Sequence, residues 1–175
     1  ATPETLAIMR ARYGETHYLM TENPLAYGEV VEIGDARVSL HPAGHILGSA
    51  QARLEHAGSS IVFSGDYKRR PDPTCTPFEP VPCDVFVTEA TFALPVFRHP
   101  PLVSLEQFPE RCHLIGVYAL GKCQRMICAL RAAGYDETIY LHGAMQRLCE
   151  LYESFGIALG PLELVAPENA KTLAG

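Results

Sequence analysis

The chain has 175 residues, 47% of them hydrophobic, which is enough for one substantial core or two small ones, so we expect a globular protein. No apolar run reaches the ~18 residues of a membrane-spanning helix, and the first residues lack a secretion signal, so we expect a cytoplasmic location. The net charge of -6 argues against a protein that coats nucleic acid through charge alone. It does not exclude a nuclease, because metal ions can supply local positive charge.

Helical and β-type patterns follow one another in the first half of the chain. Residues 2–12 predict a helix, because Thr2 and Pro3 suit its capped first turn. From residue 28 the pattern changes to short β-type runs, with Gly34 and Asp35 as a turn signal between the first two. These runs lie at 30–33, 36–40, 51–55, 60–64 and 85–88. A proline-rich connection at 71–82 precedes the last of them.

The spacing of apolar residues lengthens in the second half. We predict a strand at 113–118, a helix at 121–133 that stops at Gly134, a strand at 138–142 and a helix at 143–155 that stops at Gly156. Alternating strands and helices predict an α/β unit with parallel strands. We place a domain boundary near His99, which divides the chain into expected domains at 1–98 and 99–175.

Six cysteines would be enough for a disulfide scaffold, but their surroundings argue against one. They lie on apolar or helical stretches, and no pair has the C-x-x-C spacing of a zinc knuckle. We therefore expect reduced thiols and no structural zinc site. The six are Cys75, Cys83, Cys112, Cys123, Cys128 and Cys149.

Three polar side chains stand at the ends of β-type runs or in a glycine-containing loop beside one, namely His45, Asp66 and Glu89. A carboxylate directly after an apolar run is poorly placed for burial unless a metal ion compensates its charge. Taken singly, His45 is more typical of an ordinary loop histidine, Asp66 of a plain turn and Glu89 of a surface acid. Taken together, histidine and carboxylate ligands without cysteine suit a catalytic zinc or manganese site, which keeps a position open for water.

Several motifs resemble those of the metallo-β-lactamase-fold nucleases of the β-CASP group. AGHILGSA at 43–50, FSGDY at 63–67 and VTEAT at 87–91 resemble three motifs of the metal-binding domain. VYALGKCQR at 117–125 and IYLHGA at 139–144 resemble segments of that group's inserted domain. The order and content are most similar to bacterial exonucleases associated with an ATP-dependent DNA ligase and a helicase, also described as messenger-RNA 3′-end processing factors.

The resemblance implies a mixed α/β (α+β) fold, with part of a metallo-β-lactamase-type β-sandwich flanked by helices, followed by part of a β-CASP-like α/β domain. It implies two divalent ions, zinc or manganese, that activate water and polarise the scissile phosphate in the intact enzyme. His45 would bind one ion, and Asp66 would bridge both. Glu89 would orient a ligand histidine or the nucleophilic water, so Asp66 and Glu89 are the expected catalytic residues. His41 precedes the motif and is expected to support or pack.

Five basic residues are candidates for contacts with substrate phosphates. Three lie just after Asp66, beyond Tyr67, and two lie near the start of the helix expected at 121–133. They are Lys68, Arg69, Arg70, Lys122 and Arg125. The alternative for all five is an ordinary solvated surface. The remaining histidines lack support from the metal motifs and are expected to be structural; they are His17, His56, His99, His113 and His142.

The sequence also departs from the family pattern. The signature His-x-His-x-Asp-His is absent and would lie before Ala1, and the later histidine motifs would lie beyond Gly175. The connection that begins at His99 is shorter than the family's helical one. We therefore expect the middle of an enzyme with two metal ligands left, and we do not expect a stable two-metal site in this segment alone.

Three functions remain open from the sequence. The first is a metal-dependent phosphodiesterase, an exonuclease acting on DNA or RNA in repair or 3′-end processing, with nucleic acid, a DNA ligase and a helicase as partners. The second is another hydrolase of the same fold, although the segment ALGKCQ weighs against it because such hydrolases lack the β-CASP insertion. The third is a degenerate or truncated copy that binds nucleic acid or a partner without cleaving.

Overall fold

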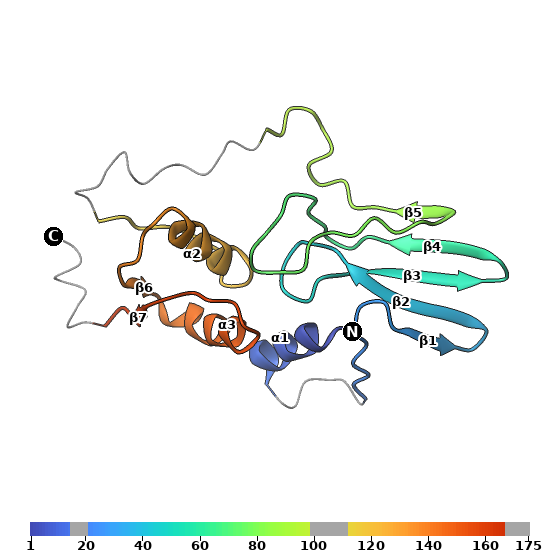
Figure 1. The fold of residues 1–175 in the computed structure, drawn as a ribbon, viewed down its shortest axis with the longest axis horizontal. Helices are drawn as coiled ribbons and strands as arrows, with labels where there is room; N and C mark the ends of the chain where they lie inside the picture. The colour runs from blue at the N-terminus through green and yellow to red at the C-terminus, as the bar shows by residue number, and fades with distance from the viewer. Residues whose placement is uncertain (15–20, 99–111, 167–175) are drawn as a thin grey trace.

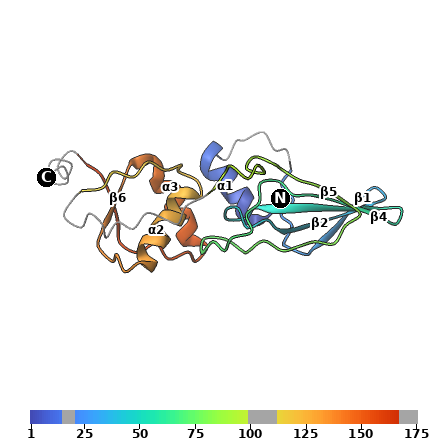
Figure 2. The ribbon, with the colours of Figure 1, turned by 90° about the horizontal axis from the view of Figure 1, so that it is seen from above.

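The computed structural model describes residues 1–14, 21–98 and 112–166, and it has a mixed α/β fold (Figure 1). One region is a sheet of β1 (Val30–Ile33), β2 (Ala36–Pro42), β3 (Ala50–His56), β4 (Ser59–Phe63) and β5 (Val85–Val87). The other contains α2 (Lys122–Ala132), β6 (Ile139–Leu141), α3 (Gly143–Ser154) and β7 (Leu162–Leu164). Helix α1 (Pro3–Tyr13) lies between the two regions in both Figure 1 and Figure 2. The predicted fold class is confirmed.

Helix α1 forms where the capping signals predict it. The Thr2 hydroxyl accepts a hydrogen bond from the Thr5 amide at 3.2 Å, and Pro3 occupies the first turn, where no intrahelical donor is needed. The helix ends before Gly14, whose φ of 82° is unfavourable for other residues. Its buried side chains, Leu6 and Ile8, face the rest of the protein.

In the sheet order β1-β2-β3-β4-β5, one terminus of each of four strands, β2 to β5, lies on the same side of the sheet, which we call one edge. β1 to β4 pair antiparallel with their neighbours, whereas β4 and β5 are parallel. The pairs Pro42↔Ala50 and Ala52↔Phe63 show that β2 ends, β3 begins and β4 ends at the same edge. Because β5 is parallel to β4, it ends there too. The loops that leave this edge therefore meet.

One face of the sheet carries a continuous row of apolar side chains. The register aligns Val31, Val38, Leu54, Ile61 and Val85 across the five strands. The side chains at both ends of the row remain open to solvent, and Val85 is 50% exposed. None of the strands in the described ranges forms a second layer over this face. Apolar sheet faces of this kind pack against a second layer in β-sandwiches, which agrees with the expected partial sandwich.

The main hydrophobic core lies among α2, α3 and β6, and it also includes residues from the first part of the chain. Ile8 from α1 and Leu47 from the β2–β3 loop belong to the same cluster as Tyr152, which is fully buried. The other members are Cys123, Ile127, Leu141, Cys149 and Leu159. The two regions therefore share packed side chains. The predicted boundary at His99 lies outside the described residues, and the division into two domains stays a prediction.

The predicted α/β unit is present, with one correction. Strands β6 and β7 pair in parallel around α3, with Ile139 opposite Leu162. The strand predicted at 113–118 is wrong, because no strand of the described chain pairs with it and Leu114 is fully exposed. The strand that pairs with β6 is β7, which the sequence did not predict.

The helices are short. The longest helix in the described part of the chain, α3, has 12 residues, whereas a helix needs about 20 apolar residues to cross a bilayer. Among the residues that the structure describes, no helix is long and apolar enough to span a membrane. The cytoplasmic location stays a prediction.

Helix α1 is fixed to the β2–β3 loop at Gly48. The hydroxyls of Thr2 and Thr5 both donate to the Gly48 carbonyl, at 2.8 and 3.0 Å. A methyl group added to Gly48 would lie 2.7 Å from Cβ of Glu4 and 2.8 Å from the Thr5 amide nitrogen. The φ of Gly48 is also +74°, in the left-handed region. Only glycine therefore fits between the loop and the helix.

We expect Gly48→Ala to lower the free energy of unfolding by about 3 kcal/mol, from backbone strain and overlap with α1. Gly28→Ala is the matched control, because Gly28 has a similar φ of +77° and no described atom lies within 4 Å of the added methyl group. That control should lose about 1 kcal/mol, from backbone strain alone. Urea unfolding midpoints measure the difference, and equal losses would contradict the close packing of α1 on the loop.

Candidate active site

The three residues that the motifs single out lie in segments that leave the sheet at the same edge. His45 lies in the β2–β3 loop, Asp66 follows β4 and Glu89 follows β5. Nε2 of His45 lies 3.9 Å from Oδ2 of Asp66. Glu89 is close enough for electrostatic attraction to His45. We call His45, Asp66 and Glu89 the edge cluster.

The β2–β3 loop is held rigidly around His45. The Ser49 hydroxyl accepts hydrogen bonds from the amides of His45 and Ile46, at 3.0 and 3.1 Å. Gly44 has a φ of +69°, and a Cβ there would lie 2.5 Å from the Lys68 carbonyl oxygen. The Lys68 amide also donates to the Ala43 carbonyl at 3.0 Å. These backbone contacts bring the loop of His45 against the segment that follows Asp66.

Ser64 links the end of β4 to the segment after β5. Its amide donates to the Val87 carbonyl at 2.9 Å, and its hydroxyl accepts from the Glu89 amide at 3.2 Å. The Glu89 carboxylate in turn accepts from the Thr91 amide at 2.9 Å. This hydrogen bond, helped by the attraction of His45, lowers the pKa of Glu89 below its ordinary value. Glu89 is therefore a carboxylate at neutral pH.

The edge cluster fits part of a metal centre. One imidazole nitrogen and one carboxylate oxygen are donors that zinc and manganese accept, and the side chains of His45 and Asp66 are 43% and 75% exposed, so both are accessible. A catalytic zinc site normally has three protein ligands. Within residues 1–14, 21–98 and 112–166, no group of three or more histidine, cysteine or acidic side chains is arranged to hold an ion. The described residues therefore do not complete such a centre.

The five basic candidates divide into two groups. Lys68 and Arg125 are both beside Asp72: the Lys68 amino group donates to its Oδ2, and Nε of Arg125 lies 3.7 Å from the same oxygen. The other three are exposed, and the Lys122 amino group lies 5.9 Å from the Tyr118 ring centroid. These three are Arg69, Arg70 and Lys122.

Sequence reasoning missed Asp72, whose side chain is only 2% exposed. Its Oδ1 accepts from the amide and the hydroxyl of Thr74, at 2.9 and 2.6 Å. Burial works to raise the pKa of Asp72, but the hydrogen bonds from Lys68 and Thr74 outweigh it and hold the pKa below its ordinary value. The only local signal was Asp-Pro-Thr at 72–74, which is typical of a turn closed by the aspartate side chain. We call Asp72, Lys68 and Arg125 the Asp72 clasp.

The other histidines have different surroundings from His45. His41 lies on β2, where Nε2 is 3.1 Å from the Ser39 hydroxyl and Nδ1 is 3.9 Å from Glu79. His142 caps α3 by accepting from the Ala144 amide at 3.2 Å. His17 and His99 lie outside the described residues.

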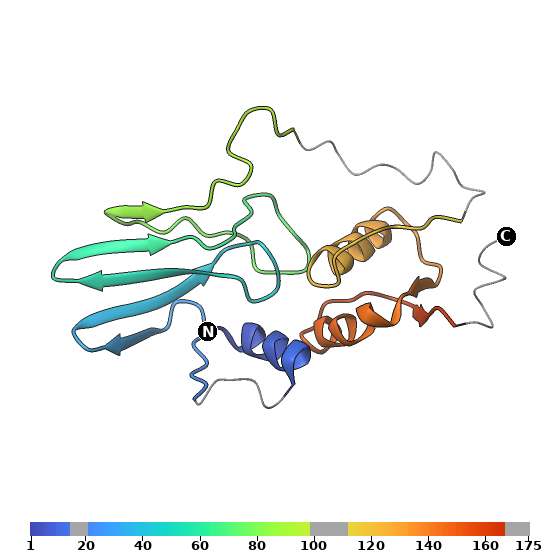
Figure 3. The ribbon, with the colours of Figure 1, turned by 180° about the vertical axis from the view of Figure 1, so that it is seen from behind.

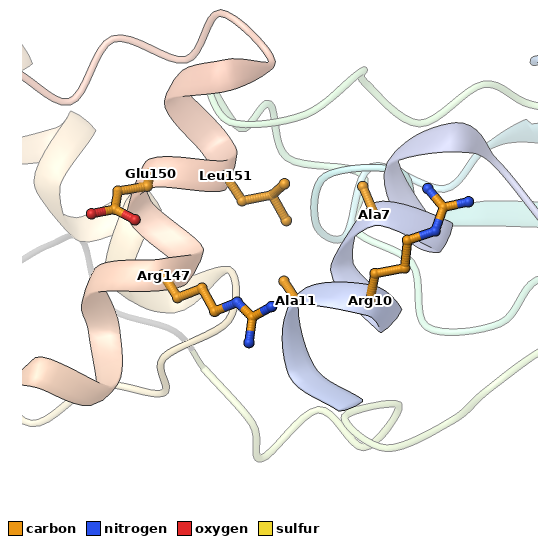
Figure 4. A pocket seen from close by; sticks show the side chains of 6 residues that line it. All are labelled: Ala7, Arg10, Ala11, Arg147, Glu150 and Leu151. Carbon is orange, nitrogen blue, oxygen red and sulfur yellow. The ribbon is translucent and has the colours of Figure 1, made fainter. Parts of the chain in front are cut away.

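A hollow of about 370 Å³ between α1 and α3 has a different lining from the edge cluster (Figure 4). Figure 4 shows Arg147 of α3 extending toward Ala11 of α1, with Arg10 on the α1 wall. Arg10 is ion-paired with Glu22. None of the residues that line this hollow belongs to the edge cluster.

Comparison with known proteins finds clear relatives, although no family model matches the chain. It is 35% identical over 170 residues to a "Probable DNA ligase" of Opitutus terrae, a match that covers 90% of this chain and 16% of that protein. It is 33% identical over 135 residues to "Endoribonuclease YSH1" of Gibberella zeae, covering 70% of this chain and 15% of that protein. "Cleavage and polyadenylation specificity factor subunit 3" of Dictyostelium discoideum is 33% identical over 115 residues, which are 59% of this chain and 15% of that protein. The chain thus spans about one sixth of the length of these relatives.

Asp72→Asn is expected to lower the free energy of unfolding by about 2 kcal/mol at neutral pH, because it leaves two cations without their buried carboxylate. The lowered pKa means that the charged carboxylate stabilises the fold above its ordinary pKa of 3.8. This stabilisation begins to decrease when the pH falls below 3.8, and it is lost as the pH falls through the lowered pKa of Asp72 in the folded protein. The difference between wild type and variant should therefore shrink in acid.

Urea unfolding at neutral and acidic pH measures this effect. Asp136→Asn is the control, because Asp136 is exposed and its replacement should change little at either pH. A loss in Asp72→Asn that stays constant down to strongly acidic pH would contradict a stabilising charge on Asp72.

Proposed function

Because the chain is homologous, over its central part, to the β-CASP group of the metallo-β-lactamase fold, we propose that it contributes to the active site of a metal-dependent phosphodiesterase that cleaves nucleic acid. The observation that carries the proposal is the edge cluster. A histidine and an aspartate from separate loops lie 3.9 Å apart, beside a carboxylate at the end of a third segment. Such a cluster of donors, at the edge where strands end, suits metal-assisted hydrolysis.

RNA is the substrate that the relatives favour, and 3′-end processing is the step. Two of the three relatives described above have names that refer to ribonuclease activity or to cleavage and polyadenylation. The third is named as a DNA ligase and matches the largest share of this chain, which supports a DNA-repair exonuclease as the second candidate. In that case a DNA ligase and a helicase are the expected partners.

We assign His45 and Asp66 as two ligands of a centre of two divalent ions, zinc or manganese, with further ligands from outside the described residues. Bound ions of this kind lower the pKa of water so that it can attack a phosphodiester at neutral pH. Asp66 follows β4 and its side chain is 75% exposed, so its carboxylate would be available to bridge the two ions. Glu89 is ionised and orients a ligand or the attacking water.

The exposed cations Arg69, Arg70 and Lys122 are the groups we assign to substrate phosphates. Arg69 and Arg70 closely follow Asp66, and Lys122 lies in the first turn of α2, where the helix dipole also favours an anion. Lys68 and Arg125 lie beside Asp72, and of these two Arg125 is the more accessible, with a side chain that is 43% exposed.

In the complete protein that contains this chain, we expect Asp66→Asn and His45→Gln each to reduce the cleavage of single-stranded RNA by at least about 100-fold. A labelled RNA and a DNA of the same sequence, each with and without EDTA, provide the assay. His41→Gln is the matched control, because His41 lies on β2, outside the edge cluster. This variant should keep activity within about twofold of the wild type. Undiminished cleavage by Asp66→Asn would disprove the assignment.

Metal content separates an enzyme from a copy that binds nucleic acid without cleaving it. Elemental analysis after gel filtration should find about two equivalents of zinc or manganese in the complete protein. Asp66→Asn should lose most of this metal, whereas His41→Gln should retain it. Full metal occupancy in Asp66→Asn would contradict its role as a bridging ligand, and a metal-free wild type would favour the non-catalytic alternative.

A further inference from the structure

We propose that Asp72 is a positioning residue, which orients Arg125 toward a phosphate of the nucleic-acid substrate and holds the start of α2 against the loop of His45. This inference rests on the proposed function, because it assigns part of the substrate contact of the same site. The Asp72 clasp joins two segments that are distant in the sequence, the loop after β4 and the first turn of α2. The ribbon in Figure 3 shows the loop after β4 passing beside the start of α2. The motifs that point to the edge cluster include neither Asp72 nor its contacts.

The two carboxylate oxygens of Asp72 have separate partners. Oδ1 accepts both hydrogen bonds from Thr74, so it fixes the carboxylate to its own turn. Oδ2 accepts from Lys68 and faces Nε of Arg125 at 3.7 Å. A carboxylate anchored on one side presents its other oxygen in a fixed direction, which is what a positioning group needs.

Arg125 is the cation of the clasp that has access to solvent. Its side chain is 43% exposed, compared with 19% for Lys68. Asp72 faces the inner nitrogen, Nε, and a guanidinium has further N–H donors at its outer end. An arginine whose Nε faces a carboxylate can still donate from its two terminal nitrogens to a phosphate in a bidentate contact.

The start of α2 is itself fixed against the edge cluster. The Gln124 side chain is fully buried, accepts from the Gly121 amide at 2.8 Å and donates to the Ala119 carbonyl at 3.0 Å. A Cβ on Gly121 would overlap the side chain of Ile46, which is the neighbour of His45. The helix therefore touches the loop of His45 at one point and Asp72 at another. Arg125, one turn from Gly121, is held close to the metal-ligand loops.

Positioning and charge predict opposite effects for Asp72→Asn. Loss of a negative charge near the substrate would by itself strengthen the binding of a polyanion. Loss of a positioning group would weaken it, because Arg125 would have to be ordered by the substrate. The sign of the change in affinity therefore distinguishes a positioning role from a purely electrostatic one.

The test measures RNA binding and cleavage by the complete protein, with a short single-stranded RNA whose fluorescence anisotropy is followed over a range of salt concentrations. We expect Asp72→Asn and Arg125→Gln each to weaken binding and raise KM by about tenfold, with kcat within about twofold. The double variant should be no weaker than Arg125→Gln alone. Arg125→Gln should also reduce the slope of log affinity against log salt by about 0.7, the value for one phosphate contact on a single strand.

Asp84→Asn is the matched control. Asp84 also accepts two hydrogen bonds, from the amide and the hydroxyl of Ser60 at 2.7 and 2.9 Å, but it lies before β5 at the opposite edge of the sheet. It should leave binding and its salt dependence unchanged. Thermal unfolding of every variant shows whether the fold is intact, and if Asp72→Asn does not fold, the salt slope of Arg125→Gln decides the proposal.

The outcomes separate the two proposals. If the wild type binds and cleaves RNA but Asp72→Asn binds it equally well or more tightly, Asp72 has no positioning role and the inference is wrong. An unchanged salt slope in Arg125→Gln would likewise overturn it. If the wild type cleaves neither RNA nor DNA, the proposed function fails, whereas weaker binding by Asp72→Asn would still support the clasp as part of a non-catalytic binding surface.

Discussion

The parallel pairing of β4 with β5 is the constraint on which the candidate site depends. It places the end of β5 at the edge where β4 also ends and where β2 turns into β3. The residues after these strands therefore meet although they are distant in the sequence. An antiparallel β5 would send Glu89 to the opposite edge, far from His45 and Asp66.

Close backbone packing then fixes the loops that leave this edge. Gly44, Gly48 and Gly121 each lie where a Cβ would overlap a neighbouring segment: the loop after β4, the start of α1 and Ile46. The β2–β3 loop is thus held by α1, α2 and the segment after Asp66 together. Because Leu47 also belongs to the main hydrophobic core, the position of His45 is coupled to the packing of the helical region.

The charged side chains near the candidate site form two groups, the edge cluster and the Asp72 clasp. The edge cluster contains His45, Asp66 and Glu89, whose donor atoms are available to ions or water. In the Asp72 clasp, Asp72 is almost fully buried and interacts with Lys68 and Arg125. A buried carboxylate needs such partners, and the cations need it if they are to hold one orientation. The Asp72 clasp therefore orders the cations, and the edge cluster presents accessible donor groups.

The sequence by itself determined the elements that depend on neighbouring residues. Thr2 and Pro3 predicted α1, Gly34 predicted the β1–β2 turn, and the apolar runs predicted all five strands of the main sheet. It also singled out His45, Asp66 and Glu89, because polar residues at strand ends form a recognisable local pattern.

Only the tertiary structure decided which of these residues meet and what holds them. The segment at 113–118 has β-type composition but is not a strand, while β7 pairs with β6. Strand formation depends on tertiary contacts as well as on composition. Asp72 looked like an ordinary turn residue, since its partner Arg125 comes from a distant helix. Long-range pairings of this kind arise from the packing of whole segments, and the residues adjacent in sequence carry no trace of them.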